Sequence, residues 1–257
     1  MRLFHGSHGN VPGVSVGASL RVTRIQTKLK GQLLLLPAAL GGGTDTLNDF
    51  DVKGWGVGAS AGVLLKPTDW LSFGVNYRSK VKATLDGDGE LATNGNFSAE
   101  FEQILPTLLT AGVAVKPKDF ITVALGYGFE HNSEIEQFVL KSPNFPADVT
   151  LNQNWVDSHT LHVGVDVVPY KNISVRAGYA KDFNKSIPDA VNNRITGDID
   201  AHETSVGIGY MKDRYSIQGA WNARFGKRDV PNNSTNIGPG HYDAIVHSIS
   251  VGVGYSI

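Results

Sequence analysis

Residues 71–78 read LSFGVNYR, and every second residue is apolar or aromatic. The leucine, phenylalanine, valine and tyrosine would point to one side of an extended chain, and the residues between them to the other. This period of two predicts a β-strand. The same alternation recurs at 173–180, 205–210 and 248–257, with mostly glycine and serine on the second face. Such strands indicate an antiparallel sheet whose two faces meet different solvents.

The alternation predicts about ten strands, which is the basis of the expected fold. We expect them at 13–32, 54–66, 70–87, 104–116, 120–131, 155–168, 172–182, 202–211, 215–225 and 247–257. The connections at 66–69, 116–119, 169–172 and 212–214 are short and polar, whereas those between them are long. Because short and long connections alternate, an up-and-down barrel would place all short turns at one end. Transmembrane β-barrels show this asymmetry, so we expect an all-β, antiparallel, up-and-down transmembrane β-barrel.

Aromatic residues gather at both ends of the expected strands, as two membrane interfaces would require. Trp70, Phe120 and Tyr215 follow short turns, whereas Trp55 and Trp221 lie toward the long loops. A soluble β-sandwich or a lipocalin-like barrel is the alternative, and it would turn the apolar face inward. The glycine and serine on the polar face favour the membrane barrel.

Composition excludes several other classes of protein. The 257 residues carry 23 Lys+Arg and 24 Asp+Glu, and this balance argues against a nucleic-acid partner. There are no cysteines, so disulfides and zinc–thiolate sites are excluded. No apolar stretch reaches the roughly 18 residues that a spanning helix needs. The first residues lack the apolar core of a signal peptide, so we expect a chain that is cytosolic, already processed or missing its beginning.

Several segments, taken in order, resemble the FadL-type family of outer-membrane transport proteins. They include GWGVGASAGVLLKPTD at 54–69 with LSFGVNYRSKV at 71–81, and WVDSHT at 155–160. The strand endings SVGIGY at 205–210 and SVGVGY at 250–255 close the series. Each segment alone is weak, but their joint order over about residues 14–257 is specific.

The resemblance implies an outer-membrane channel through which fatty acids or other hydrophobic small molecules diffuse passively, without a cofactor. It further implies a 14-stranded barrel with an N-terminal hatch, contact with outer-membrane lipid, and insertion by the barrel-assembly machinery of a Gram-negative bacterium. This chain matches only the last two thirds of the family pattern. We therefore expect residues 1–257 to form a single β-barrel domain that is N-terminally truncated, without the hatch and the first strands.

Apolar residues in the long loops are candidates for ligand binding. Leu34, Leu35 and Leu36 open the connection 33–53, and exposed apolar patches usually serve binding. In the family the outward loops form an apolar groove, which Phe101 and Leu105 could complete. The alternative is that these side chains extend a lipid-facing strand or pack beneath neighbouring loops.

Two arginines are candidates for binding a carboxylate inside the barrel. Arg78 shares the phase of Ser72, Gly74 and Asn76, and Arg176 likewise falls on the polar face of its strand. A guanidinium there could form a charge-assisted hydrogen bond with a fatty acid. The alternative is that each arginine pairs with an acidic neighbour.

A catalytic site and a metal site have less support. Asp157 with His159, and Asp200 with His202, share a strand face, as outer-membrane hydrolases require, but no serine nucleophile or acidic pair accompanies them. His159 and His162 point to opposite faces, so they make a poor metal site. A transport barrel is thus the first hypothesis, with a structural or adhesive barrel second and a hydrolase third. The second predicts a lumen filled with ion pairs, and the third predicts a histidine bonded to a carboxylate.

Overall fold

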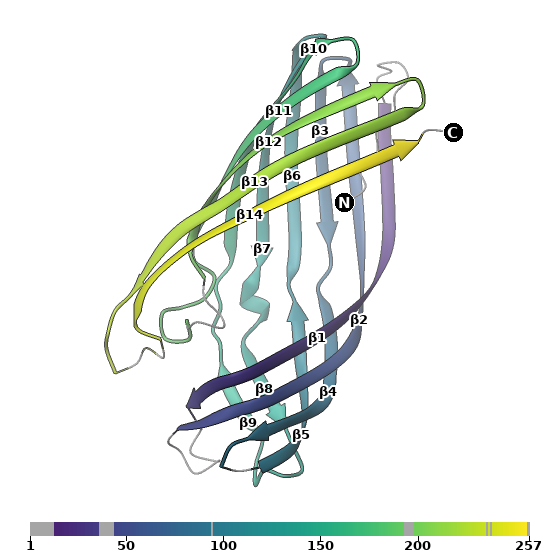
Figure 1. Ribbon diagram of the computed structural model, residues 1–257. Helices are drawn as coiled ribbons and strands as arrows, with labels where there is room; N and C mark the ends of the chain where they lie inside the picture. Colours follow the sequence, from purple (N-terminus) through teal and green to yellow (C-terminus); the bar gives the residue numbers. More distant parts are fainter. Residues whose placement is uncertain are drawn as a thin grey trace.

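The computed structural model describes residues 13–35, 44–93, 95–192, 198–234, 236 and 238–255, which form one antiparallel sheet of 14 strands (Figure 1). The strands are β1 (Gly13–Leu35), β2 (Thr44–Thr68), β3 (Leu71–Arg78), β4 (Val81–Leu91), β5 (Gly95–Leu105), β6 (Thr107–Lys118), β7 (Ile121–His131), β8 (Gln137–Lys141), β9 (Val149–Asn152), β10 (Ser158–Tyr170), β11 (Ile173–Phe183), β12 (Asp200–Lys212), β13 (Tyr215–Val230) and β14 (Gly240–Tyr255). A single turn of 3-10 helix, η2 (Asn132–Glu134), follows β7. Within these ranges no helix is long and apolar enough to cross a membrane.

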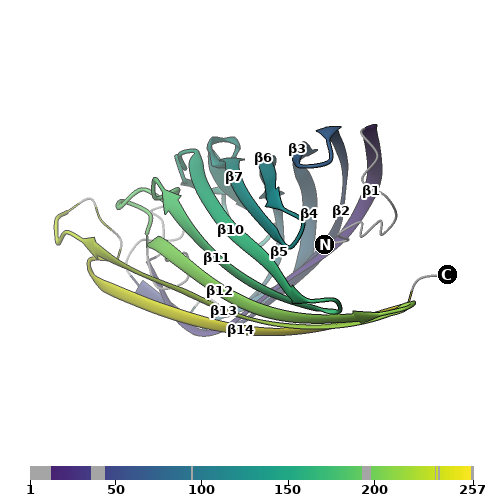
Figure 2. The ribbon, with the colours of Figure 1, turned by 90° about the horizontal axis from the view of Figure 1, so that it is seen from above.

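Ten strands follow one another around an arc, in the order β1-β2-β3-β6-β7-β10-β11-β12-β13-β14 (Figure 2). The long strands β1 and β14 lie at its two edges. In the described chain β1 pairs only with β2, and β14 pairs only with β13. No β1–β14 ladder therefore closes the arc.

The expected all-β, antiparallel fold is confirmed, but the expected number of strands was too low. Each of the ten strands of the arc coincides with an expected one. The strand expected at 70–87 is broken into β3 and β4, and segments expected to be loops form β5, β8 and β9. The strands β4, β5, β8 and β9 extend from β2 as a second branch of the sheet, in the order β2-β4-β5-β8-β9, at the long-loop end.

The sheet forks where the second branch leaves the arc. β2 pairs with β3 through Ser60–Thr68 and with β4 through Leu47–Val57. Between β3 and β4, the amide of Ser79 donates to the carbonyl of Ala59 (2.8 Å), and the Ser79 hydroxyl accepts from the amide of Ala59 (2.9 Å). Pro106 interrupts the neighbouring strand at the same level, between β5 and β6. Proline cannot donate a hydrogen bond to the ladder, which accounts for the interruption at Pro106. The breaks at Ser79 and at Pro106 therefore both lie at the fork.

The tight turns lie together at the other end of the arc, as the sequence predicts. β2 and β3, β6 and β7, β10 and β11, and β12 and β13 are each joined by two residues. The pairing slips beside Pro67, Pro117 and Pro169, just before three of these turns. A proline there creates a β-bulge because it has no N–H for the ladder.

The two faces of the arc differ as their alternation predicts. On β13 and β14 the apolar side chains Ile217, Ile249, Val251 and Val253 are exposed, with 81% of Ile249 accessible. Serine, glycine and asparagine occupy the opposite face of these strands. Side chains two strands apart reach one another there: Arg176 on β11 bonds Gln218 on β13. The polar face is therefore the concave one, and we call it the inner face.

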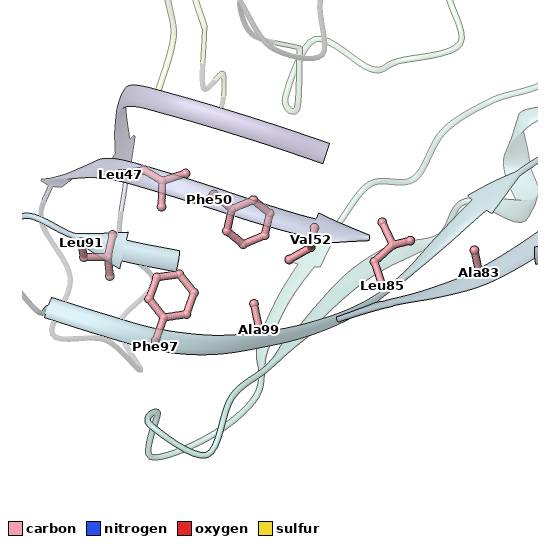
Figure 3. Close-up of a cluster of buried hydrophobic side chains, with 8 residues drawn as sticks. All are labelled: Leu47, Phe50, Val52, Ala83, Leu85, Leu91, Phe97 and Ala99. Carbon is pink, nitrogen blue, oxygen red and sulfur yellow. The ribbon is translucent and has the colours of Figure 1, made fainter. Parts of the chain in front are cut away.

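At the fork the inner face is closed over by a hydrophobic core. The core residues are Leu47, Phe50, Val52, Ala83, Leu85, Leu91, Phe97 and Ala99, drawn from β2, β4 and β5 (Figure 3). Val52 and Leu85 are fully buried. A Cβ on Gly54 would overlap the carbonyl oxygen of Thr84 on the paired strand. Glycine at this position therefore lets β4 fold tightly against β2.

Candidate functional site

A groove runs along the inner face of β7 and β10 to β14. It has a volume of about 600 Å³, and its lining includes Thr122, Ala124, Gly164, Asp166, Arg176, Gly178, Ser205, Gly207, Gln218, Ala220, Ser250 and Gly252. Most of these side chains are small because the inner positions of the strands are glycine, serine and alanine. The structural-barrel hypothesis predicts a lumen filled with ion-paired side chains. The open groove along these strands differs from that prediction.

Arg176 lies in the groove, but its charge is neutralised. Its Nε donates to Asp166 Oδ2 (2.8 Å), and its Nη1 donates to Gln218 Oε1 (3.2 Å). Asp166 and Arg176 are register partners across the β10–β11 hairpin. Arg176 therefore has the acidic neighbour that the sequence analysis gave as the alternative to carboxylate binding.

Arg78 has a different environment, at the fork of the sheet. It is exposed on the inner face at the end of β3, and in the described chain it makes no ion pair. Its cross-strand partner is Ser60, and Arg21 on β1 is paired with nearby Gly58. Arg21 donates to the carbonyl of Ser79 (3.2 Å), while its buried Nε has no partner in the described chain. The two guanidinium groups interact electrostatically, so the fork carries two like charges.

A carboxylate near the fork, that of Glu134, bonds groups other than the two arginines. Glu134 accepts the amide of Thr107 (2.9 Å) and pairs with the ammonium of Lys80 (3.3 Å). Burial alone would raise the pKa of Glu134, but these bonds stabilise the carboxylate and lower its pKa overall. Glu134 therefore stays ionised and anchors η2 to the fork.

An apolar row leads to the arginines along the inner face of β5. It begins with the buried Phe97 and Ala99 and continues with the half-buried Phe101 and Leu105, with the polar side chain of Gln103 between the last two. The ring of Phe101 stacks on Phe50, with centroids 6.2 Å apart. Leu105 pairs with Val81, the first residue after the break that follows Arg78. Phe101 and Leu105 thus lie on one face of β5, and Leu105 is level with the break that follows Arg78.

Leu34 and Leu35 are not brought to this row. They pair with Asp45 and Thr44 at the far end of β1. Phe101 pairs with Leu85, Leu85 pairs with Gly54, and Gly54 pairs with Ile25, so Phe101 lies level with Ile25 of β1. Nine residues of strand separate Leu34 from Ile25, or about 30 Å. Leu36 lies outside the described residues, so the groove expected from the leucines stays a prediction.

Beyond the apolar core, a buried arginine holds the connection between β11 and β12. The Arg228 side chain is 1% exposed and pairs with Asp189 (2.6 Å). It also donates to the carbonyls of Ile187 (2.6 Å) and Asp198 (3.1 Å). Sequence analysis did not single out Arg228, because its partners come from a connection whose path the sequence leaves open.

The proposed catalytic pairs make other contacts. Asp157 accepts the amide of Ser133 (3.0 Å), whereas His159 Nδ1 bonds the hydroxyl of Tyr127 (2.5 Å). His202 Nδ1 likewise bonds the hydroxyl of Tyr179 (2.6 Å).

A different histidine meets the carboxylates that the hydrolase hypothesis requires. His241 lies at the long-loop end, with Nδ1 bonded to Asp229 and Nε2 bonded to Asp243 (2.9 Å for the second pair). The hydrogen bond that His241 donates to Asp229 and the negative charge of Asp243 raise the pKa of His241. Because both ring nitrogens are occupied, His241 is poorly placed to act as a general base. In the described ranges no group of three histidine or acidic side chains could hold a metal ion.

Comparisons with known proteins agree with this architecture. Residues 10–256 match the sequence model of the family described as outer membrane protein transport protein (OMPP1/FadL/TodX). Comparison with curated protein sequences found no match.

Solved structures of similar fold include proteins from three bacteria. A FadL homologue of Pseudomonas aeruginosa is 21% identical with a TM-score of 0.67, over 93% of this chain and 62% of that one. The Pseudomonas putida toluene transporter TodX is 20% identical with a TM-score of 0.62, over 94% and 65%. The Ralstonia pickettii toluene transporter TbuX is 16% identical with a TM-score of 0.62, over 94% and 63%. The chain thus spans less than two thirds of each, and the likeness concerns the fold.

Proposed function

The chain belongs to the OMPP1/FadL/TodX family of outer membrane transport proteins, and we propose that it conducts hydrophobic compounds across the outer membrane by passive diffusion. The apolar convex face would contact outer-membrane lipid after insertion by the barrel-assembly machinery. The open groove on the inner face is the observation that supports a conduit. The proposal involves no cofactor and no catalytic step.

Among hydrophobic compounds, we propose long-chain fatty acids as the substrate class. The support comes from the fork, where the apolar row on β5 ends beside Arg21 and Arg78. An apolar chain could lie along Phe101 and Leu105 while its carboxylate binds the guanidinium groups through charge-assisted hydrogen bonds. Arg176 is the weaker candidate because Asp166 already neutralises it. Leu34, Leu35 and Leu36 remain proposed contacts for ligand at the entrance.

Neutral aromatic hydrocarbons are the competing substrate class. Two of the three solved structures reported above are described as toluene transporters. In this chain Phe50, Phe97, Phe101 and Phe145 form an aromatic cluster. Such a ligand would use the apolar row but would gain nothing from the arginines.

Uptake into liposomes separates these possibilities. The refolded chain should admit labelled oleate and exclude glucose. The double substitution Arg21→Met and Arg78→Met should lower oleate uptake on the order of tenfold and leave toluene uptake unchanged. Equal loss of both, or no loss of either, would contradict the role of the arginines. A chain that admits neither oleate nor toluene would contradict the transport function itself.

A further inference from the structure

A small cavity lies at the short-turn end of the inner face, away from the fork. Its volume is about 160 Å³, and it is lined by Lys66, Thr68, Asp69, Trp70, Ser72, Ala114, Lys116 and Thr122. Ser72 on β3 and Ala114 on β6 are register partners on the polar side of their strands. The cavity therefore opens on the same face as the groove.

Two similar turns bring its two lysines together. Residues 66–70 read KPTDW and residues 116–120 read KPKDF, so each turn carries a lysine followed by a proline. The pairing slips between Leu65 and Thr68, and again between Val115 and Lys118. The amide of Lys116 donates to the carbonyl of Trp70 (2.7 Å), which fixes one turn beside the other. The bulges thus place Lys66 and Lys116 on the wall of one cavity.

The polar groups of the cavity suit an anion. Lys66 and Lys116 form no ion pair in the described chain, and Asp69 is the only carboxylate among the lining residues. The cavity therefore carries one net positive charge. The Thr68 Oγ1 atom is buried and makes no hydrogen bond with the described protein, and Thr68 is a lining residue of the cavity. A rotation of its side chain would let the hydroxyl donate to a bound group. Ser72 and Thr122 supply two further hydroxyls.

We propose that this cavity binds the carboxylate of an amphipathic acid at the short-turn end of the passage. Lys66 and Lys116 supply the charge, and the Thr68 hydroxyl donates a hydrogen bond. The proposal rests on the function proposed above, because the acid reaches the cavity along the inner face. A cavity of this size holds about five water volumes, so it takes the head group while the apolar chain remains outside.

This second site gives the passage two cationic positions. Arg78 and Ser72 are six residues apart on β3, which corresponds to about 20 Å. An acid leaving the arginines at the fork would meet the lysines next, before release at the short-turn end. Neutral compounds would bypass both positions.

Trp70 offers a local reporter for the test. Phenylalanine in place of Trp55, Trp155 and Trp221 leaves Trp70 as the only tryptophan, and its fluorescence is titrated with 2-bromodecanoate in detergent. We expect saturable quenching, with affinity lowered on the order of tenfold by Lys66→Met with Lys116→Met. Thr68→Val should also weaken binding without lowering stability, since the hydroxyl it removes is unpaired in the free protein. Lys171→Met, in a different short turn, is the matched control and should change nothing.

Three outcomes would overturn the site. They are quenching that ignores both lysines, equal quenching by neutral 2-bromodecanol, and equal competition by inorganic phosphate, which would indicate a site for small oxyanions. Oleate and toluene uptake by the same proteins separates the two proposals. Uptake combined with lysine-independent quenching rejects only the cavity site, whereas lysine-dependent quenching without uptake rejects only the transport function.

Discussion

The core branch, formed by β4, β5 and the facing part of β2, contrasts with the open wall of β10 to β14. In the core branch Val52 and Leu85 are fully buried, whereas in the open wall Ile249 and Val253 are each 81% exposed. Both regions are built from alternating apolar residues. The alternation therefore defines a face in each region, but the neighbours of that face decide whether protein or lipid covers it.

The largest contrast is expected from shortening a leucine in each region. Leu85→Ala should lower the free energy of unfolding by about 2–5 kcal/mol, because the core cannot fill the cavity. Leu161→Ala, on the outer face of β10 and 45% exposed, should cost less than half as much because detergent or lipid adapts to it. Denaturant unfolding in micelles measures both. Equal costs would mean that the two regions do not differ in the way described.

The polar anchoring of the open wall gives the next largest effect. Arg228→Met should lower the free energy of unfolding by about 3 kcal/mol, because it leaves Asp189 without its buried partner. This value is at the low end of the range for a broken buried ion pair, since Asp189 is itself partly exposed. Lys227→Met is the neighbouring control, because its ion pair with Asp243 is exposed. The same unfolding measurement applies. A loss no greater than that of the control would show that the arginine does not hold the connection.

Close approach of the backbone in the core branch predicts a smaller effect. Gly54→Ala should cost about 1–3 kcal/mol, because the new methyl group overlaps the carbonyl of Thr84 and forces β4 away from β2. Gly74→Ala tests the arc, where the nearest atom to a new Cβ would be 3.8 Å away. Thermal unfolding should show a clear shift for the first variant alone. Similar shifts would contradict the tight folding of the branch.

The smallest effect concerns pH at the edge of the open wall. The pKa of His241 is raised in the folded protein, so its bonds to Asp229 and Asp243 stabilise the fold fully below about pH 6.5. This contribution is lost as pH rises through the folded pKa. Unfolding midpoints between pH 5 and 9 should fall for the natural chain and fall less for His241→Asn. Identical profiles would exclude the histidine as the cause.

The open wall could be predicted almost completely from the sequence, whereas the core branch could not. In the wall, each strand alternates up to a polar connection, apart from the bulge beside Pro169 at the end of β10. In the branch, Asp86, Asp88 and Glu90 make the outer positions of β4 strongly charged, and the expected strand was ended at residue 87, before Asp88 and Glu90. The break at Ser79 and Lys80 keeps Arg78 and Val81 on the same face, which a strict period of two forbids.

The candidate site divides in the same way. The pairing of Arg176 with Asp166 follows from the register of the β10–β11 hairpin after the bulge beside Pro169 has shifted it by one residue. Pro169 is the sequence signal for that bulge. The partnership of Arg21 with Arg78 depends on β2 lying between their strands and on the fork of the sheet. Neither feature has a local signature, so Arg21 was not predicted.

Spin labels along β13 test most directly whether lipid covers the apolar face and the passage lies along the polar face. The chain contains no cysteine, so single cysteines at positions 216 to 222 can be labelled cleanly in lipid vesicles. Collisions with oxygen should peak at Ile217, Gly219 and Trp221, and collisions with a water-soluble nickel complex at the positions between them. A profile without this period of two, or with the two reagents exchanged, would contradict the assignment.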